Sequence, residues 1–176
     1  LYEPLRWKGV YGDITENATT LLPGEKQTYE FIRHLIEAAS KPFRTKRIHI
    51  GMDEAWHLGR GKYLDKHGSV PAGEIMIAHL KRVMKIVRSL GLSPMMWSDM
   101  FFRAYAPDGD YYNPKTEIPE EAAEQVPPGV KLVYWDYYHY AKDTYESFIE
   151  KHRKLGEPIF AGGIWTWLGF GVNWAK

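Results

Sequence analysis

Cysteine is absent from the 176-residue sequence, which excludes disulfide bonds and thiolate metal sites within this chain. Long apolar runs are lacking too, and those present fall well short of the length that a membrane span needs. Lys and Arg are not concentrated in any stretch and the net charge is +1, which argues against nucleic acid as a partner. No signal peptide opens the chain, so the compartment stays open, with a slight preference for the cytoplasm.

Aromatic residues, in contrast, are abundant, since the chain contains 7 Trp and 12 Tyr. Many gather in clusters, which are Trp97-Ser98-Asp99, residues 134–140 and Trp165-Thr166-Trp167. Aromatic planes beside hydrogen-bonding carboxylates suit sugars, because the faces of a sugar are apolar and its rim carries hydroxyl groups. The clusters therefore predict carbohydrate binding, and the alternative is that large aromatic side chains simply fill the core.

Hydrophobic periodicity predicts alternating strands and helices along the chain. Short apolar strands are expected at residues 46–52, 94–97, 130–135 and 159–163. Helices are expected from about residue 28 to the residue before Pro42, at residues 73–90, and from a capping box of Asp143 and Glu146 to Leu155. The remaining long stretches, residues 1–25 and 106–128, are expected to be irregular apart from one short helix around Glu120.

Short apolar strands that alternate with helices predict an α/β fold with a parallel sheet. Polar and aromatic clusters directly follow the expected strands, and functional residues at the carboxyl ends of successive strands are the layout of a (β/α)8 TIM barrel. A complete barrel takes about 250 residues, so we expect residues 1–176 to form one partial domain, about half of a barrel. An open half barrel exposes the edges of its sheet, so a homodimer is expected if this chain is complete. The alternative is that the loops at residues 1–25 and 104–128 cover these edges.

The segment His49-Ile50-Gly51-Met52-Asp53-Glu54 resembles the catalytic signature of glycoside hydrolase family 20, the β-N-acetylhexosaminidases. The resemblance continues through residues 55–64, Met96-Trp97-Ser98-Asp99-Met100, Tyr134-Trp135-Asp136-Tyr137-Tyr138 and Gly162-Gly163-Ile164-Trp165-Thr166-Trp167. An Asp-Glu dipeptide alone carries no information, but four motifs in the right order at expected strand ends are specific. The similarity covers about residues 22–170 and implies a (β/α)8 catalytic domain.

The resemblance implies an enzyme that hydrolyses terminal, non-reducing β-linked N-acetylglucosamine, with N-acetylgalactosamine as the alternative, from oligosaccharides or glycoconjugates. In this family the nucleophile is the substrate's own 2-acetamido oxygen, and the configuration is retained. Glu54 is then the acid that protonates the leaving oxygen and later the base toward water. Asp53 orients the acetamido group and stabilises its charge. Neither a cofactor nor a metal ion is implied.

Further residues are implied to bind the substrate, namely His49, Trp97, Asp99, Trp135, Asp136, Tyr137, Tyr138, Trp165 and Trp167. The tryptophans would form the walls of the sugar subsite, with the last two as alternatives to each other, and the aspartates would accept hydrogen bonds from sugar hydroxyls. The tyrosine that holds the acetamido carbonyl is expected to be Tyr137 or Tyr138, and Tyr134 also fits the Tyr-x-Asp spacing. The alternative is a tyrosine outside this chain. For His49, the alternative to orienting the acidic pair or touching substrate is a satisfied core histidine.

Two features of the family pattern are missing from the chain. No Arg lies at the end of a first barrel strand, and no final strand follows Trp167. We therefore expect the missing strands to flank this segment on both sides.

Two other classes of function compete with this interpretation. Glu54-Ala55-Trp56-His57 has the Glu-x-x-His spacing of metal-binding helices. A metal-dependent hydrolase would complete its site with Asp99, Asp136 and His139. However, Gly59 and Gly61 predict a loop after this segment. A non-catalytic carbohydrate-binding module would use the aromatic clusters alone and would not need the acidic pair.

Overall fold

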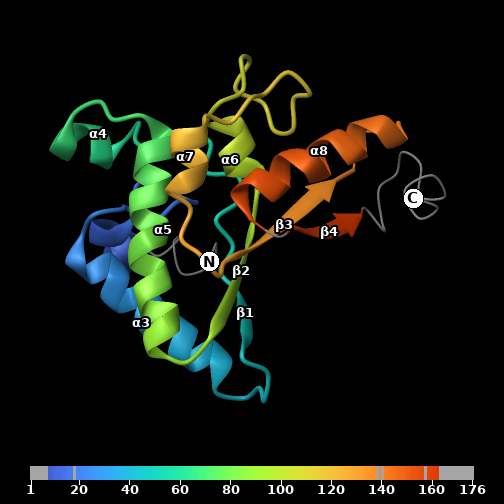
Figure 1. The fold of residues 1–176 in the computed structure, drawn as a ribbon. Coiled ribbons are helices and arrows are strands. Elements are labelled where there is room, and N and C mark those ends of the chain that lie inside the picture. Colours follow the sequence, from blue (N-terminus) through green and yellow to red (C-terminus); the bar gives the residue numbers. More distant parts are fainter. Residues whose placement is uncertain (1–7, 18, 138, 140, 157, 163–176) are drawn as a thin grey trace. The chain divides into compact units, whose positions relative to one another are not determined.

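The computed structural model describes residues 8–17, 19–137, 139, 141–156 and 158–162. Its elements (Figure 1) are, in order, α2 (Lys8–Tyr11), the 3₁₀ turn η1 (Gly12–Ile14), α3 (Lys26–Ser40), β1 (Arg47–His49), α4 (Lys62–His67), α5 (Ala72–Ser89), β2 (Ser93–Trp97), α6 (Asp99–Arg103), α7 (Glu120–Glu124), β3 (Lys131–Asp136), α8 (Lys142–Leu155) and β4 (Pro158–Gly162). The chain divides into two compact units, of which residues 1–48 and 54–93 form the first, and residues 49–53 and 94–176 the second. No helix within the described ranges is long and apolar enough to cross a membrane.

Two amphipathic helices, α3 and α5, pack together in the first unit. The buried residues of α3 are Thr28, Tyr29, Ile32 and Ile36. The buried residues of α5 include Met76, Leu80, Val83 and Val87. Each set recurs every three to four positions and so occupies one face of its helix. Both predicted helices are therefore confirmed, close to their expected bounds.

Gly91 ends α5 in the left-handed conformation that its position after the last helical turn predicts. Its φ is 68°. Gly91 N–H donates to the Arg88 carbonyl at 3.0 Å, and Leu92 N–H donates to the Val87 carbonyl at 3.1 Å. These two bonds form a Schellman cap, which satisfies carbonyl groups that the end of a helix leaves without partners. The cap turns the chain directly into β2.

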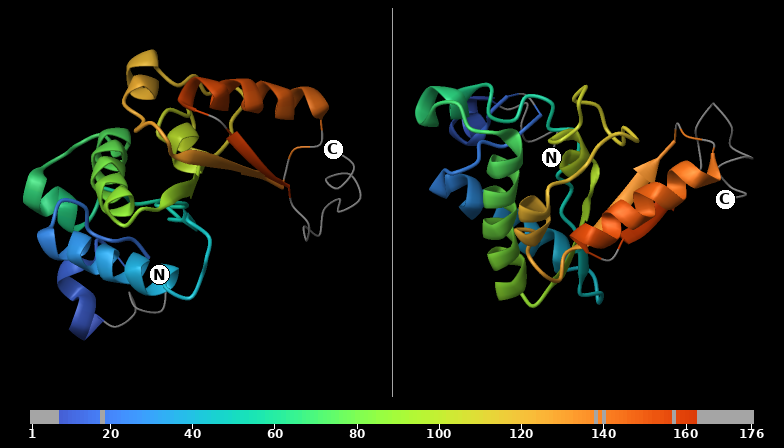
Figure 2. Two further views of the ribbon diagram at one scale, coloured as in Figure 1. Left: turned by 60° about the horizontal axis from the view of Figure 1, so that its bottom comes forward. Right: turned by 45° about the horizontal axis from the view of Figure 1, so that its top comes forward.

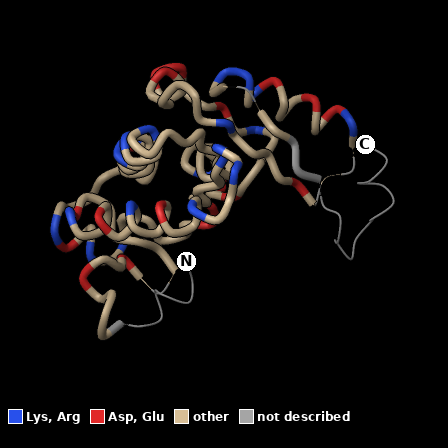
Figure 3. The backbone as a smooth tube through the Cα atoms, turned by 90° about the horizontal axis from the view of Figure 1, so that it is seen from below, with Lys and Arg blue, Asp and Glu red and all other residues tan. Residues whose placement is uncertain are grey.

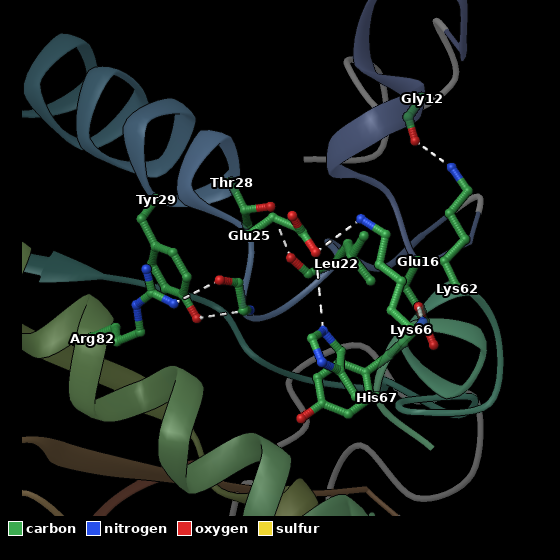
Figure 4. Close-up of polar contacts among 12 residues, drawn as sticks. Gly12, Glu16, Leu22, Glu25, Thr28, Tyr29, Lys62, Lys66, His67 and Arg82 are labelled. Carbon is green, nitrogen blue, oxygen red and sulfur yellow. Dashed lines mark hydrogen bonds and ion pairs between the residues drawn. The ribbon is translucent and has the colours of Figure 1, made fainter. Parts of the chain in front are cut away.

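A buried carboxylate organises the segment around α4 in the first unit (Figure 4). Glu16 is 5% exposed and accepts hydrogen bonds from the backbone N–H groups of Gly61 at 2.8 Å and Tyr63 at 2.7 Å. These N–H groups lie at the start of α4, where a helix has unsatisfied donors and favours negative charge. The loop expected around Gly59 and Gly61 is confirmed, but α4, which begins directly after it, was not predicted, because a residue distant in the sequence supplies its cap.

Two cations of the first unit bind groups near the start of α3 (Figure 4). Lys66 Nζ lies 2.9 Å from Glu25 Oε1, and this hydrogen bond lowers the pKa of Glu25. The guanidinium carbon of Arg82 lies 3.6 Å from the centroid of the Tyr29 ring, which is a cation–π contact. Water screens exposed charge pairs, so the apolar packing of α3 on α5 contributes more to the stability of this unit.

The described strands form one sheet in the order β1-β2-β3-β4, so each strand lies beside the next one in the sequence. β2 and β3 are parallel with Met95 opposite Lys131, and β3 and β4 are parallel with Leu132 opposite Pro158. Ile50 N–H donates to the Met95 carbonyl at 2.8 Å and joins the end of β1 to β2. Parallel strands in sequential order are the arrangement of a barrel wall. The predicted fold class, a partial (β/α) barrel, is confirmed, and the homodimer stays a prediction.

Burial differs strongly between the strands. β3 is buried from Leu132 to Asp136, and α8 packs against β3 and β4 and runs alongside them (Figure 1, Figure 2). Helical cover over a parallel strand explains its nearly continuous apolar sequence. β1 comprises only Arg47–His49, and both of these end residues are exposed. The expectation of a buried strand over residues 46–52 was wrong, because β1 is an outer strand of the described sheet.

Several local features also differ from those expected. α8 begins after Ala141 without a side-chain cap, so Asp143 lies inside the first turn rather than in a capping box. Figure 3 shows that α8 carries both charge signs, and Lys142 Nζ lies 3.3 Å from Glu146 Oε1. α6 forms directly after β2, and α2 and η1 lie in a stretch expected to be irregular. The short helix expected around Glu120 is confirmed as α7.

Candidate active site

Most of the predicted site residues lie at the carboxyl ends of strands in the second unit. His49 ends β1, Trp97 ends β2, and Asp136 ends β3. Trp135 precedes Asp136, and Asp99 is the first residue of α6. Ligands of α/β folds bind at the carboxyl ends of parallel strands. Tyr138, Trp165 and Trp167 lie outside the described residues.

The acidic pair Asp53–Glu54 lies in an exposed turn shortly after β1. The backbone of this turn is strained, since φ is 74° at Met52 and 50° at Glu54, and it is 72° at Gly51. A left-handed backbone costs energy for a residue with a side chain, and such strain is concentrated at functional sites. Trp97 N–H donates to the Gly51 carbonyl at 3.1 Å and ties the turn to β2. The two carboxylates are thus accessible and carried by a backbone with a specific conformation.

His49 is exposed and packs against Trp97, with the two ring centroids 4.5 Å apart. Gly51 N–H donates to His49 Nδ1 at 3.1 Å, so this nitrogen carries no proton. Partial desolvation lowers the pKa of His49, and the charge of Asp53 opposes this change. A neutral His49 that accepts a bond from the turn fits the predicted role of orienting the acidic pair, whereas its exposure argues against a core histidine.

Asp99 and Trp135 contact each other across the ends of β2 and β3. Trp135 Nε1 donates to Asp99 Oδ1 at 3.4 Å. Asp99 is fully buried and Trp135 is 8% exposed. The rings of Tyr111 and Tyr137 lie 5.5 Å and 5.3 Å from the Trp135 ring. The ends of these strands therefore carry an aromatic cluster that is bonded to a carboxylate.

The buried carboxylate of Asp136 accepts hydrogen bonds from two neighbouring residues. Tyr134 OH donates to Oδ2 at 2.7 Å, while His139 donates its backbone N–H to Oδ1 at 3.2 Å and Nδ1–H to Oδ2 at 2.7 Å. Burial and the charge of Asp136 raise the pKa of Tyr134, so its hydroxyl stays a donor. A carboxylate has about four acceptor positions, most of which are used here. Binding of sugar hydroxyls by Asp136 stays a prediction.

Three residues at these strand ends were not predicted to belong to a sugar site. His139 was considered only as a metal ligand, and its side chain is 30% exposed and oriented by Asp136. His152 lies on the same buried face of α8 as Phe148, so the helical period could have revealed it. Tyr112 lies in the Pro-rich loop, and no sequence pattern marks it.

The buried His152 predicts a loss of stability in acid. Burial lowers its pKa from 6.5 to about 4, against the hydrogen bond to the Phe148 carbonyl, which raises it. Between these pH values the unfolded chain binds a proton that the folded chain does not, so this contribution is present above pH 6.5 and is lost as the pH falls to about 4. One pKa unit corresponds to about 1.4 kcal/mol, so we expect the contribution of His152 to the free energy of unfolding to fall by about 3 kcal/mol. Urea unfolding across this pH range checks the prediction, and an equally steep loss in His152→Gln would contradict it.

The geometry around the acidic pair differs from that of a metal-binding helix. Residues 54–57 precede α4 and form no helix. A Glu-x-x-His pair converges on a metal ion only when a helical turn places both residues on one face. Among the residues that the structure describes, no group of three His, Asp or Glu side chains is arranged to hold a metal ion.

Comparisons with known proteins identify a family for this chain. Residues 7–154 match the sequence model of glycosyl hydrolase family 20, catalytic domain. The chain is 27% identical over 150 residues to hexosaminidase D of Homo sapiens. The aligned region covers 79% of this chain and 28% of that protein. A β-N-acetylhexosaminidase structure from Bacteroides fragilis matches with a TM-score of 0.55 and 12% identity, over 94% of this chain and 34% of that one. The chain therefore spans about a third or less of the length of these relatives, and the structural match supports the barrel fold.

Proposed function

Since the chain belongs to glycosyl hydrolase family 20, we propose that the protein carrying it removes terminal β-linked N-acetylglucosamine, or N-acetylgalactosamine, from the non-reducing ends of glycans. The observation that carries this proposal is the Asp53–Glu54 pair, which lies in a strained and exposed turn after β1. Reacting groups of a (β/α) barrel lie at this end of its strands. His49 and Trp97, which contact each other beside the turn, support the same location.

The proposed reaction is hydrolysis with retention of configuration and without a cofactor. The 2-acetamido oxygen of the substrate attacks the anomeric carbon, and the bond to the leaving oxygen breaks as Glu54 donates its proton to that oxygen. Asp53 accepts a hydrogen bond from the acetamido N–H and stabilises the positive charge of the oxazolinium intermediate. The Glu54 carboxylate then takes a proton from the water that attacks the anomeric carbon. This step reopens the intermediate and restores both residues.

Sugar binding is proposed for the aromatic cluster and the carboxylates beside it. Trp97 and Trp135 offer apolar surfaces, and Asp99 and Asp136 offer acceptors for hydroxyl groups. Tyr137 is proposed to hold the acetamido carbonyl, because it is half-buried beside Trp135, whereas the Tyr134 hydroxyl is buried and bonded to Asp136. The parts assigned to Tyr138, Trp165 and Trp167 stay predictions.

Release of the aryl group from an aryl β-N-acetylglucosaminide and from an aryl β-glucoside, measured side by side, tests the proposal. The glucoside has no acetamido group and therefore no internal nucleophile, so we expect its hydrolysis to be slower by about 10³-fold or more. The natural full-length protein should be used, because this chain spans only part of its relatives. Equal rates on both substrates would rule out substrate assistance, and no release from either would rule out the proposed activity.

A further inference from the structure

A continuous chain of hydrogen bonds runs within the second unit from α8 to the end of β3. His152 Nε2 lies 2.7 Å from Ser98 Oγ, which lies 2.9 Å from the hydroxyl oxygen of Tyr112. The same phenol oxygen accepts the backbone N–H of Trp135 at 3.5 Å. His152 and Ser98 are fully buried and Tyr112 is 3% exposed. Water therefore does not compete for these groups, and each depends on its partner in the chain.

The direction of each bond follows from the chemistry at the α8 end. His152 Nδ1 lies 2.6 Å from the Phe148 carbonyl oxygen, which can only accept, so Nδ1 carries the proton. Burial keeps the ring neutral by lowering the pKa of His152 to about 4, so Nε2 is an acceptor. Ser98 must then donate its hydroxyl proton to Nε2, and Tyr112 must donate to Ser98 Oγ. Burial raises the pKa of Tyr112, which keeps this last proton in place.

Tyr112 is strained in a way that only its surroundings maintain. Its φ is 34°, which lies in the left-handed region. Its ring lies 5.2 Å from the Phe102 ring, 4.8 Å from the Tyr134 ring and 5.5 Å from the Phe148 ring, measured between centroids. A residue with a side chain keeps such a backbone only when packing and hydrogen bonds outweigh the strain. The packing of its ring and the hydrogen bonds of its hydroxyl group together determine the position of the Tyr112 hydroxyl.

The chain ends on residues that the proposed function uses. Ser98 immediately precedes Asp99, and Ser98 N–H donates to the Val133 carbonyl at 3.1 Å. Trp135, whose backbone contacts Tyr112, donates its indole N–H to Asp99. His152 Nε2 is therefore linked through the Ser98 hydroxyl to the backbone segment that carries Asp99. Through the Ser98 and Tyr112 hydroxyls in series, it is also linked to the backbone of Trp135.

We propose that His152 is a positioning residue for the sugar-binding site, acting through Ser98 and Tyr112 on Asp99 and Trp135. This inference rests on the proposed function, since it takes Asp99 and Trp135 as residues that contact the sugar. His152 itself is fully buried and does not touch substrate. Loss of its acceptor leaves the Ser98 hydroxyl only the longer bond to the Val133 carbonyl, at 3.2 Å instead of 2.7 Å, and the shift of this hydroxyl loosens both sugar contacts. Binding is affected, while the proton transfer assigned to Glu54 is not.

Two substitutions of His152 distinguish the effect of its acceptor Nε2 from that of the rest of the side chain. The amide oxygen of His152→Gln can reach the place of Nε2 and accept from Ser98, whereas His152→Asn is too short and retains only a group near Nδ1. With an aryl β-N-acetylglucosaminide and the natural full-length protein, we expect His152→Asn to raise KM by about 10-fold and to leave kcat within about 3-fold. His152→Gln should stay within about 3-fold of the wild type in both constants.

His79→Asn is the matched control, because it makes the same change at another desolvated histidine. His79 Nδ1 lies 3.0 Å from Tyr29 OH, and desolvation lowers its pKa to about 4, but it belongs to the first unit and takes no part in this chain of hydrogen bonds. We expect His79→Asn to lower the Tm without raising KM. An equal rise of KM in His152→Asn and His152→Gln, or a similar rise in His79→Asn, would overturn the proposal.

Two further measurements keep the test decisive. Tyr112→Phe retains the ring and removes the hydroxyl, so it should raise KM like His152→Asn. It tests the proposed hydrogen-bond chain if the histidine variants do not fold.

Binding of N-acetylglucosamine, followed by tryptophan fluorescence, compares the same variants without turnover. If the wild type binds the sugar but does not release it from glycosides, the proposed activity fails, and the Kd values still test the role of His152. An unchanged Kd in both His152→Asn and Tyr112→Phe would overturn that role.

Discussion

Glu54→Gln is expected to lower kcat by at least about 10²-fold, because the leaving oxygen no longer receives a proton from the side chain. Gln is close to Glu in size, so the exposed turn around residue 54 should keep its conformation. The loss should shrink for substrates with very good leaving groups, since these need little protonation. Values of kcat for a series of aryl β-N-acetylglucosaminides, ordered by the pKa of the leaving phenol, measure this dependence.

Glu124→Gln provides the control for Glu54→Gln. It makes the same chemical change at an exposed position of α7, and kcat should stay within about 2-fold of the wild type, as for most surface substitutions. A loss in Glu54→Gln that is the same for good and poor leaving groups would show that Glu54 is not the acid.

Asp53→Asn is expected to lower kcat by about 10²- to 10³-fold, in line with the removal of one group that stabilises charge in the transition state. Asp53 is assigned to the acetamido nucleophile, which takes part in the reaction of every substrate in the series. An uncharged amide cannot stabilise the positive charge of the oxazolinium intermediate. The loss should therefore be similar for good and poor leaving groups, which the same series of aryl substrates measures.

The contrast between the two variants tests the division of roles within the acidic pair. Asp143→Asn, an exposed change in the first turn of α8, is the control for Asp53→Asn and should leave kcat within about 2-fold of the wild type. If Glu54→Gln and Asp53→Asn give indistinguishable profiles across the leaving groups, the assignment of acid and orienting group is incorrect.

The long helices α3 and α5 and the strands β2, β3 and β4 were predicted close to their observed bounds, whereas β1 and α4 were not, for a physical reason. The apolar period of α3 and α5 is local, because residues three and four positions apart always share a helix face. The left-handed conformation of Gly91 after α5 is likewise local, because it depends only on a glycine that follows the last helical turn. β1 is shorter and more exposed than expected, because burial of a strand depends on which strands lie beside it. α4 was not predicted, because its cap comes from Glu16, which is far away in the sequence.

The candidate site shows the same division between local and distant information. The order of the motifs predicted that Asp53–Glu54, Trp97-Ser98-Asp99 and Trp135-Asp136 follow successive strands, and the structure places them there. The sequence did not predict the left-handed backbone at Met52 and Glu54, since neither is a glycine. Their assigned roles in catalysis and sugar binding stay predictions until the variants are measured.

The amino-acid sequence by itself determined the family, the partial barrel and the acidic pair at a strand end, because these depend on periodicity and on the order of short motifs. Only the tertiary structure decided which polar groups satisfy one another. Ser98 bonds to Tyr112 and His152, which are 14 and 54 residues away in the sequence. Hydrogen bonds require partners within about 3 Å and with a suitable direction. Such proximity arises from the packing of α8 and the Pro-rich loop on the sheet, and no local pattern encodes it.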